Sequence, residues 1–348
     1  MTSRKRFISL AAIATATVIA LAGCVPGEGS NLAADPEPAA TLPGSWSSDV
    51  LNIDFATYNP LSLIIKDQGW LESTFGDKVT VNWVQSAGSA AANDALRAGS
   101  IDVGSTAGSA ALLARSNGSP IKTIDIYSQP NWSAILVGPN SDIKTVADLK
   151  GKNIAANAGT DPYFFLLQTL DEAGIAQSDV TITQLAHADG KTALEAGTVD
   201  AWAGLDPLLS ASVVNAGSKI IYDNPAFNSY GFLNATEGFL SKSPDIAQVV
   251  VDAYEKAREW AVANPDDAAQ ILADVAGIDL AIAKSVLIDR TNLEVDPKPG
   301  KAQTDVLSII GPIFVESGAV ADQSQIDDAL DSLYDTTYID NVDTSLIG

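Results

Sequence analysis

Short apolar runs alternate with segments of helical periodicity along most of the chain. The runs LNIDFAT (51–57), VTVNWVQ (79–85) and IKTIDIYS (121–128) are rich in the β-branched and aromatic residues typical of strands. Between them, apolar positions recur three and four residues apart, which indicates helices packed on a sheet. This alternation predicts an α/β protein with mostly parallel strands. From Pro244 onward the periodicity is helical, so we expect C-terminal helices to complete the fold.

The same pattern starts again after Pro139, with strand candidates at residues 153–156, 180–186 and 198–204. The segments ALRAGSIDVGS and ALEAGTVDAWA share Ala-Leu-x-Ala-Gly-x-(Ile/Val)-Asp at the same position of a β-loop-α-β unit. This internal echo favours two lobes of like topology. Because ligands in open α/β sheets bind beyond the carboxyl ends of the strands, two facing lobes would place their loops in one cleft.

The expected hinge between the lobes follows from where the pattern restarts and returns. We expect the chain to cross between lobes near residues 137–140 and 233–236. The expected parts are a signal peptide (1–23), a flexible tether (24–49), a first lobe with the C-terminal helices (50–138 and 235–348) and a second lobe (139–234).

The N-terminus has the features of an export signal. Basic residues at positions 4–6 precede an apolar run over residues 7–21, which is too short for a comfortable membrane span. The run ends in Leu-Ala-Gly-Cys, which matches the lipobox of bacterial lipoproteins, so Cys24 is the predicted lipidation site. No other cysteine occurs in the sequence, which excludes an intramolecular disulfide. The Pro-, Gly- and Ser-rich stretch that follows predicts a tether.

Charge and residue usage exclude several classes of function. The sequence has 20 Lys and Arg against 43 Asp and Glu, a formal net charge of −23. This balance argues against nucleic acid and against electrostatic binding to anionic lipid. One histidine and one cysteine are too few for a zinc site or a Cys–His nucleophile. No phosphate loop or dinucleotide fingerprint occurs, so we expect no catalysis, no metal and no cofactor.

A loop of small polar residues, GSTAGS (104–109), is expected to follow a short strand and open a helix. Its hydroxyls can cap the helix, or can join the free N–H groups in holding an anion. Similar loops lead into helices at residues 86–89 and 159–161. No arginine falls in a predicted cleft loop, which disfavours a doubly charged anion. A monoanion such as a sulfonate can be held without one, so we interpret GSTAGS as both cap and anion cradle.

Other candidates have a structural alternative beside the functional one. Asp161 and Asp206 each precede a proline and so resemble helix N-caps, although one residue can cap a helix and contact a ligand. Trp132 and Trp202 lie at or beyond strand ends, where they would either pack in the core or line an apolar wall for an alkyl chain. His187 opens a predicted loop and is interpreted as a surface or turn residue, with ligand contact as the less favoured alternative.

The chain also resembles a known family. YNPLSLIIKDQGWLE, ALRAGSIDVGSTAGSAALLARSNGSPIK, KTVADLKGKNIA and ALEAGTVDAWAGLDP are similar in order and spacing to segments of ABC-importer substrate-binding proteins for aliphatic sulfonates, taurine and nitrate. The resemblance covers about residues 51–333 and implies a type II, two-lobed periplasmic-binding-protein fold that closes on its ligand. The sequence departs from the family pattern in the glycine loop of the first lobe, where many members have a proline and this chain has Ala107, Ser109 and Ala110.

The resemblance implies a monomeric lipoprotein that captures a small organosulfonate in the cleft and delivers it to an importer's permease and ATPase. The alternatives are nitrate or a thiamine-precursor pyrimidine in the same role and, third, an enzyme on the same fold. The candidate ligand-binding residues are Tyr58, Asn59, Ser86, Gly88, Ser89, Ser105, Thr106, Trp132, Gly159, Thr160, Asp161, Asp189, Trp202 and Asp206.

Overall fold

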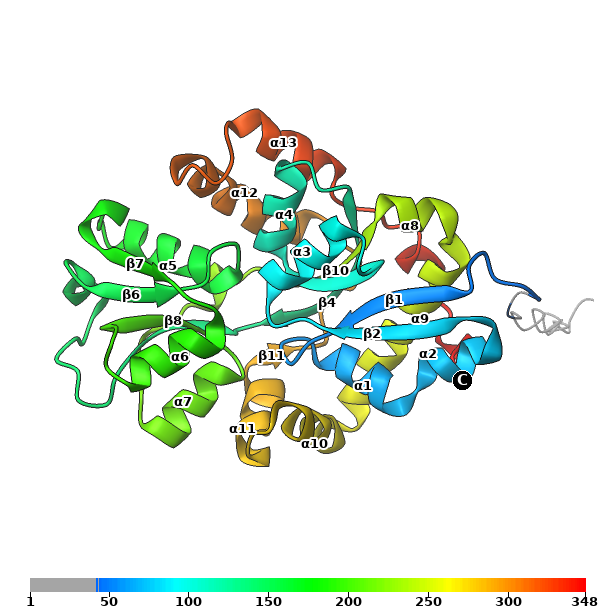
Figure 1. Cartoon of the computed structure of the whole chain (residues 1–348), viewed down its shortest axis with the longest axis horizontal. Coiled ribbons are helices and arrows are strands. Elements are labelled where there is room, and N and C mark those ends of the chain that lie inside the picture. Colours follow the sequence, from blue (N-terminus) through cyan, green and yellow to red (C-terminus); the bar gives the residue numbers. More distant parts are fainter. Residues whose placement is uncertain (1–41, 43) are drawn as a thin grey trace, which may run out of the picture. The chain divides into compact units, whose positions relative to one another are not determined.

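Two β-sheets flanked by helices make up the described part of the chain (Figure 1). The computed structural model describes residue 42 and residues 44–348. The predicted signal peptide, Cys24 and the tether as far as residue 41 lie outside the described residues. Among the residues that are described, no helix combines the length and the apolar character needed to cross a membrane.

The first sheet has the strand order β11-β4-β10-β3-β1-β2. β1 runs parallel to both β2 and β3, and Ile53 lies opposite Trp83 on one side and Val103 on the other. β10 is antiparallel to β3 and to β4. The bounds are β1 Val50–Phe55, β2 Thr80–Gln85, β3 Val103–Ala107, β4 Ile121–Pro130, β10 Gly231–Thr236 and β11 Thr291–Asn292.

The second sheet repeats this arrangement with the order β7-β6-β8-β5-β9. β6 is parallel to β7 and β8, while β5 is antiparallel to β8 and β9. The predicted α/β class and the like topology of the two halves are therefore confirmed. The bounds are β5 Ser133–Val137, β6 Asn153–Ala156, β7 Thr181–Gln184, β8 Ala201–Leu205 and β9 Lys219–Tyr222.

The chain crosses between the sheets at other positions than predicted. It leaves the first sheet at Asn131 and Trp132, between β4 and β5, and returns over residues 223–230, between β9 and β10. The expected crossings at 137–140 and 233–236 are wrong, because they lie at the end of β5 and inside β10. The Gly-Pro-Asn turn after β5 is a stronger sequence signal than the two residues that separate β4 from β5.

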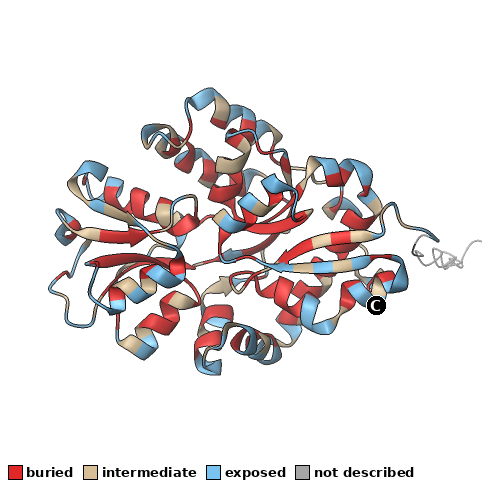
Figure 2. Ribbon diagram, viewed as in Figure 1, coloured by how far each residue is buried: buried red, intermediate tan, exposed pale blue. Residues whose placement is uncertain are grey.

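Helices cover both sheets, and buried residues follow the strands and the sheet-facing sides of the helices (Figure 2). The longest, α9, buries Val250, Tyr254 and Ala257 in the same core as Ile53 of β1. The bounds are α1 Pro60–Gln68, α2 Trp70–Phe75, α3 Ser89–Ala98, α4 Gly108–Ser116, α5 Asp161–Glu172, α6 His187–Glu195, α7 Leu208–Ala216, α8 Glu237–Lys242, α9 Pro244–Ala263, α10 Pro265–Ala276, α11 Leu280–Lys284, α12 Lys301–Glu316 and α13 Gln323–Ser332.

The internal echo corresponds to one hydrogen-bonding arrangement that occurs in both sheets. The Asp102 N–H donates to the Asn52 carbonyl at 2.7 Å, and Asp102 Oδ2 accepts from the Asn52 N–H at 2.8 Å. Asp200 and Asn153 make the same two bonds, each at 2.8 Å. Each aspartate thus precedes a strand, β3 or β8, and binds it to its parallel neighbour. The repeated sequence therefore marks equivalent positions of the two sheets.

Candidate functional site

Asp161 is the hub of a buried network where the chain passes between the sheets. Its Oδ1 accepts from the hydroxyls of Ser109 and Ser229, each at 2.7 Å. Its Oδ2 accepts from Trp132 Nε1 at 2.7 Å and from the Ser229 N–H at 2.9 Å. Burial raises the pKa of Asp161, and these donors oppose the rise. Protein donors thus occupy both oxygens, so Asp161 links the two sheets in this structure and is not the N-cap of α5, which is Thr160.

The GSTAGS stretch forms the buried end of β3 and the start of α4. Ser105 and Thr106 lie inside β3 and are fully buried. The Ser105 N–H and hydroxyl donate to Asp54, while Thr106 Oγ1 accepts from Asn234 Nδ2 at 2.8 Å. The first two amides of α4 donate to the segment that returns from the second sheet. The expected free donors are therefore already paired within the protein.

Several first-sheet candidates belong to this buried polar layer. The Tyr58 hydroxyl donates to the Ser105 carbonyl at 2.9 Å. Asn59 caps α1 and donates through Nδ2 to the Tyr254 hydroxyl at 3.0 Å. Burial raises the pKa of Asp54 to about 7, against hydrogen bonds from Ser86 and Ser105 that lower it. These contacts give Tyr58, Asn59 and Ser86 structural partners.

Asp206 is bound by an arginine that the sequence analysis missed. Asp206 Oδ1 accepts from the N–H and hydroxyl of Ser210, at 2.9 and 2.6 Å. Its Oδ2 accepts from Arg290 Nε at 2.8 Å, and Arg290 also pairs with Asp223. The N-cap residue of α7 is Pro207, so Asp206 caps from one position further back. Arg290 belongs to no motif and lies 84 residues after Asp206, so the sequence contains no signal for this contact.

Both candidate tryptophans pack in the interior. Trp202 is 1% exposed and belongs to a hydrophobic cluster with Leu136 and Leu194. A Cβ atom at Gly190 of α6 would lie 2.7 Å from its Nε1, so the helix rests directly on the indole. Trp132 donates to Asp161 and its ring meets Tyr58 edge-on at 6.1 Å. Both indoles thus have packing or hydrogen-bond partners within the protein, and Trp132 also lines a small pocket with Tyr58 and Arg290.

The starts of α3 and α6, from opposite sheets, face each other. A Cβ atom at Gly88, the N-cap residue of α3, would lie 3.1 Å from His187 Cδ2 and 3.3 Å from its Nε2. The same point is 4.0 Å from Asn157 Nδ2. Neither Gly88 nor Ala186, the N-cap residue of α6, supplies a side-chain cap. The free N–H groups of both first turns, with their positive dipole ends, are thus available here.

His187 is the first residue of α6, which corrects the predicted loop over residues 187–190. Its side chain is 2% exposed, and neither ring nitrogen has a hydrogen-bond partner. Burial lowers the pKa of His187 to about 4, so the imidazole is neutral near pH 7. Asp189, two residues on, is exposed to solvent.

A loop of the second sheet also approaches α3. A Cβ atom at Gly159, whose φ is 75°, would lie 4.0 Å from Ala90 Cβ and 3.9 Å from Leu113 Cδ2. Thr160 Oγ1 donates to the Asn157 carbonyl at 2.6 Å, which fixes the turn locally. We call this meeting of α3, α6 and the loop over residues 157–160 the junction.

The junction brings together part of the predicted site. It contains Gly88 and Gly159 with their neighbours Ser89 and Thr160. The Ser89 hydroxyl has a partner within the protein, because its Oγ accepts from the Ala107 N–H at 2.9 Å. His187 and Asn157 join it, although the candidate set did not include them. Asp189 lies in the first turn of α6, beside the junction, with its side chain in solvent. The candidates that the structure places elsewhere are Tyr58, Asn59, Ser86, Ser105, Thr106, Trp132, Asp161, Trp202 and Asp206.

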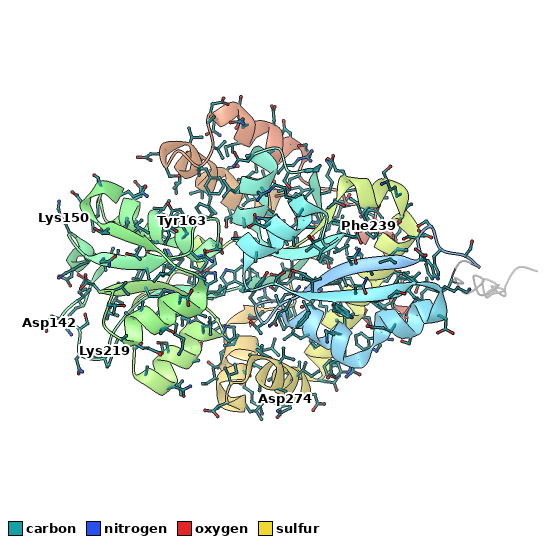
Figure 3. The ribbon with its side chains drawn as sticks, viewed as in Figure 1. Asp142, Lys150, Tyr163, Lys219, Phe239 and Asp274 are labelled. Atoms are coloured by element: carbon teal, nitrogen blue, oxygen red, sulfur yellow. The ribbon has the colours of Figure 1, made fainter. Side chains whose placement is uncertain are left out.

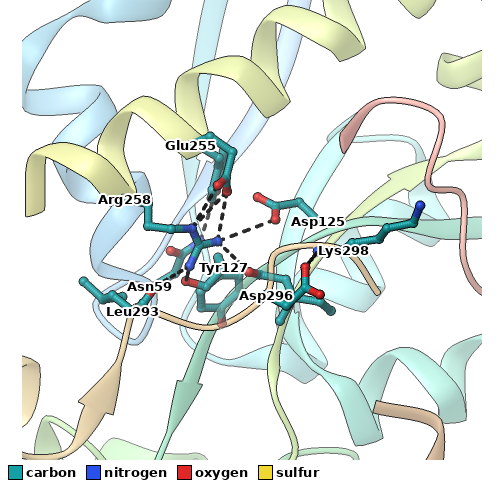
Figure 4. Close-up of polar contacts among 10 residues, drawn as sticks. Asn59, Asp125, Tyr127, Glu255, Arg258, Leu293, Asp296 and Lys298 are labelled. Atoms are coloured by element: carbon teal, nitrogen blue, oxygen red, sulfur yellow. Dashed lines mark hydrogen bonds and ion pairs between the residues drawn. The ribbon is translucent and has the colours of Figure 1, made fainter. Parts of the chain in front are cut away.

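Charged side chains also lie in other parts of the fold. Lys150 and Lys219 are exposed at the outer end of the second sheet (Figure 3). A buried ion cluster joins α9 to β4, where Arg258 Nε lies 3.0 Å from Glu255 and Arg258 Nη2 lies 3.6 Å from Asp125 (Figure 4). Burial raises the pKa of Asp125 and Glu255 adds to the rise, which Arg258 opposes. Among the described residues, no group of three His, Cys, Asp or Glu side chains is arranged to hold a metal.

Comparison with known proteins shows which family the chain matches. A family model described as "NMT1/THI5 like" matches residues 66–268, more than half of the chain. A Bacillus subtilis protein named as an aliphatic sulfonates-binding protein is 32% identical over 230 residues, 65% of this chain and 69% of that protein. The residues matched by the family model include most strands of both sheets.

Solved structures of sulfonate-binding proteins share the fold. The alkanesulfonate-binding protein SsuA from Xanthomonas axonopodis pv. citri, bound to MOPS, has a TM-score of 0.73 at 25% identity, covering 83% of this chain and 99% of that one. The periplasmic aliphatic sulphonate binding protein SsuA from Escherichia coli has a TM-score of 0.70 at 27% identity, covering 83% and 93%. The two-sheet arrangement is thus that of periplasmic binding proteins.

Proposed function

The chain belongs to the NMT1/THI5-like family, and on that premise we propose that it captures a small organosulfonate outside the cytoplasm and delivers it to an ABC importer. The observation that carries the proposal is the junction, where two uncapped helix starts from opposite sheets face each other. Helix N-termini bind anions through their free N–H groups and dipoles. The relatives named as sulfonate-binding proteins support the same ligand class.

In this proposal the ligand is an alkanesulfonate or a taurine-like molecule. A single negative charge suits a site whose donors are amides and neutral side chains, because a dianion loses more hydration on burial and gains most from charged donors. The two sheet regions act as lobes that close on the ligand about the segments at Asn131–Trp132 and residues 223–230. No chemical step is required, so the protein is a binding protein and not an enzyme.

We expect ethanesulfonate and taurine to raise the melting temperature of the full-length protein, kept in detergent. A ligand that binds only the folded state stabilises it by about 2.7 kcal/mol at a hundredfold excess over its Kd. Sulfate, nitrate and a hydroxymethylpyrimidine serve as matched probes of other charge and shape. A shift with nitrate or the pyrimidine and none with either sulfonate would contradict the proposed ligand.

The proposal includes a lipid anchor at Cys24, supported by the lipobox in the sequence. Cys24→Ser is expected to abolish incorporation of labelled fatty acid and to leave the protein released or retained as precursor. Ser30→Ala, in the tether, is the control and should remain anchored. Fatty-acid labelling of Cys24→Ser equal to that of the unaltered protein would disprove the anchor.

A further inference from the structure

The single histidine has no structural partner in the fold. The side chain of His187 is almost fully buried, yet both of its ring nitrogens lack a hydrogen-bond partner. A buried polar group without a partner destabilises the folded state. Such a group is rare in native proteins, and one explanation is a partner that arrives from outside the chain.

The surroundings of His187 are suited to an anionic partner. The Cδ2–Nε2 edge of the ring faces the backbone of Gly88 in the first sheet region, and Asn157 Nδ2 approaches the same point. A side chain at position 88 would stand 3.1 Å from the ring, so glycine keeps this approach open. The first turns of α3 and α6 add N–H groups without side-chain caps. Four sources of donors thus converge on one place.

The imidazole acts here as a neutral donor. Burial lowers the pKa of His187, and no charged group contributes to that shift. A neutral imidazole carries one N–H and one acceptor nitrogen. It can therefore donate to an oxygen without adding a full positive charge to the site.

We propose that His187 is a ligand-contacting, specificity-determining residue whose imidazole N–H donates to an oxygen of a sulfonate held between the starts of α3 and α6. Asn157 supplies a second donor from the same sheet region. This inference rests on the proposed function and deepens it. All four sources of donors are neutral, so we expect this site to favour a sulfonate over sulfate, which carries a second charge and loses more hydration on burial.

The first test uses the fact that the chain contains one histidine. In full-length protein with isotopically labelled histidine, every imidazole nitrogen signal comes from His187. Saturating ethanesulfonate is expected to shift the signal of the bonded nitrogen and to slow exchange of its proton with water. Ring signals that stay unchanged, while calorimetry records binding, would overturn the proposal.

The second test compares two substitutions at His187. His187→Phe keeps a ring but removes the donor, so affinity for ethanesulfonate should fall roughly ten- to hundredfold. Its melting temperature should stay equal or rise, because an unpartnered polar group is removed. His187→Gln keeps an N–H donor and should recover part of the affinity. A purely structural histidine would give the reverse, a lower melting temperature with unchanged affinity.

The outcomes separate this inference from the proposed function. If no sulfonate binds the unaltered protein, both fail. If ethanesulfonate binds with equal affinity to His187→Phe and to the unaltered protein, only the role of His187 fails. Binding that is lost in His187→Phe and partly restored in His187→Gln, at undiminished melting temperature, supports both.

Discussion

Asp161→Ala is expected to lower the free energy of unfolding by about 3–5 kcal/mol, because it leaves a set of buried donors without an acceptor. The lost partners are the hydroxyls of Ser109 and Ser229, the Ser229 N–H and the Trp132 indole. These donors come from α4 and from the two crossing segments, whereas Asp161 belongs to the second sheet region, so the change should also loosen the connection between the sheets. Urea denaturation monitored by tryptophan fluorescence measures the difference.

Asp189→Ala is the matched control for this experiment. Asp189 is exposed in the first turn of α6, so its removal should change stability by no more than about 0.5 kcal/mol. The opposite result would be an Asp161→Ala variant with unchanged unfolding free energy and reduced affinity for sulfonate. Asp161 would then be a ligand contact, and its hydrogen bonds would not contribute to the stability of the fold.

Asp54→Asn is expected to stabilise the protein increasingly as the pH rises from about 4 to 8. The folded-state pKa of Asp54 is about 7, raised above the ordinary 3.8 by burial. A raised carboxyl pKa means that the folded state holds the proton more tightly. The stability that this group contributes is therefore complete below pH 4 and is lost as the pH rises through 7. Above about pH 7 the loss is complete, and the raised pKa of Asp54 lowers the free energy of unfolding by about 4 kcal/mol.

The measurement is the difference in unfolding free energy between Asp54→Asn and the unaltered protein at several pH values. Asparagine keeps an oxygen that can accept from Ser105 and cannot ionise, so the difference isolates the buried charge. Asp77→Asn, at an exposed position, provides a comparison for a surface carboxylate. A difference for Asp54→Asn that does not vary between pH 4 and 8 would mean that Asp54 ionises in the folded protein as it does in water.

The sequence predicts the elements of this fold better than it predicts the site. β-Branched runs and regular apolar spacing are local properties, and the strands and helices follow them closely. Whether a small polar residue faces solvent is decided by distant partners. Ser105 and Thr106 look like loop donors, but the Ser105 hydroxyl donates to Asp54, and Thr106 Oγ1 accepts from Asn234, both far away in sequence.

His187 illustrates the same limit from the opposite direction. Gly190 and Asp189 resemble a turn, so the segment was expected to be a loop. In the structure α6 begins at His187, and Gly190 lies inside this helix, where it lets the helix rest on Trp202. The His187 ring is buried against Gly88 of the first sheet region. His187, which the sequence predicts to lie at the surface, is therefore buried by packing against residues far away in sequence. The internal echo, by contrast, was informative because its two copies occur at equivalent positions of the two sheets.

The crossing also determines how the two halves of the molecule could be separated. β4 ends and β10 begins as antiparallel neighbours, so joining them directly would make an ordinary β-hairpin and leave the first sheet whole. β5 and β9 are likewise antiparallel neighbours, and the Ser133 N–H donates to Asn228 at 3.0 Å beside the point of return. The second half is thus an insertion into the first whose two ends adjoin. A single recombination event could add or remove it without breaking a strand of either sheet.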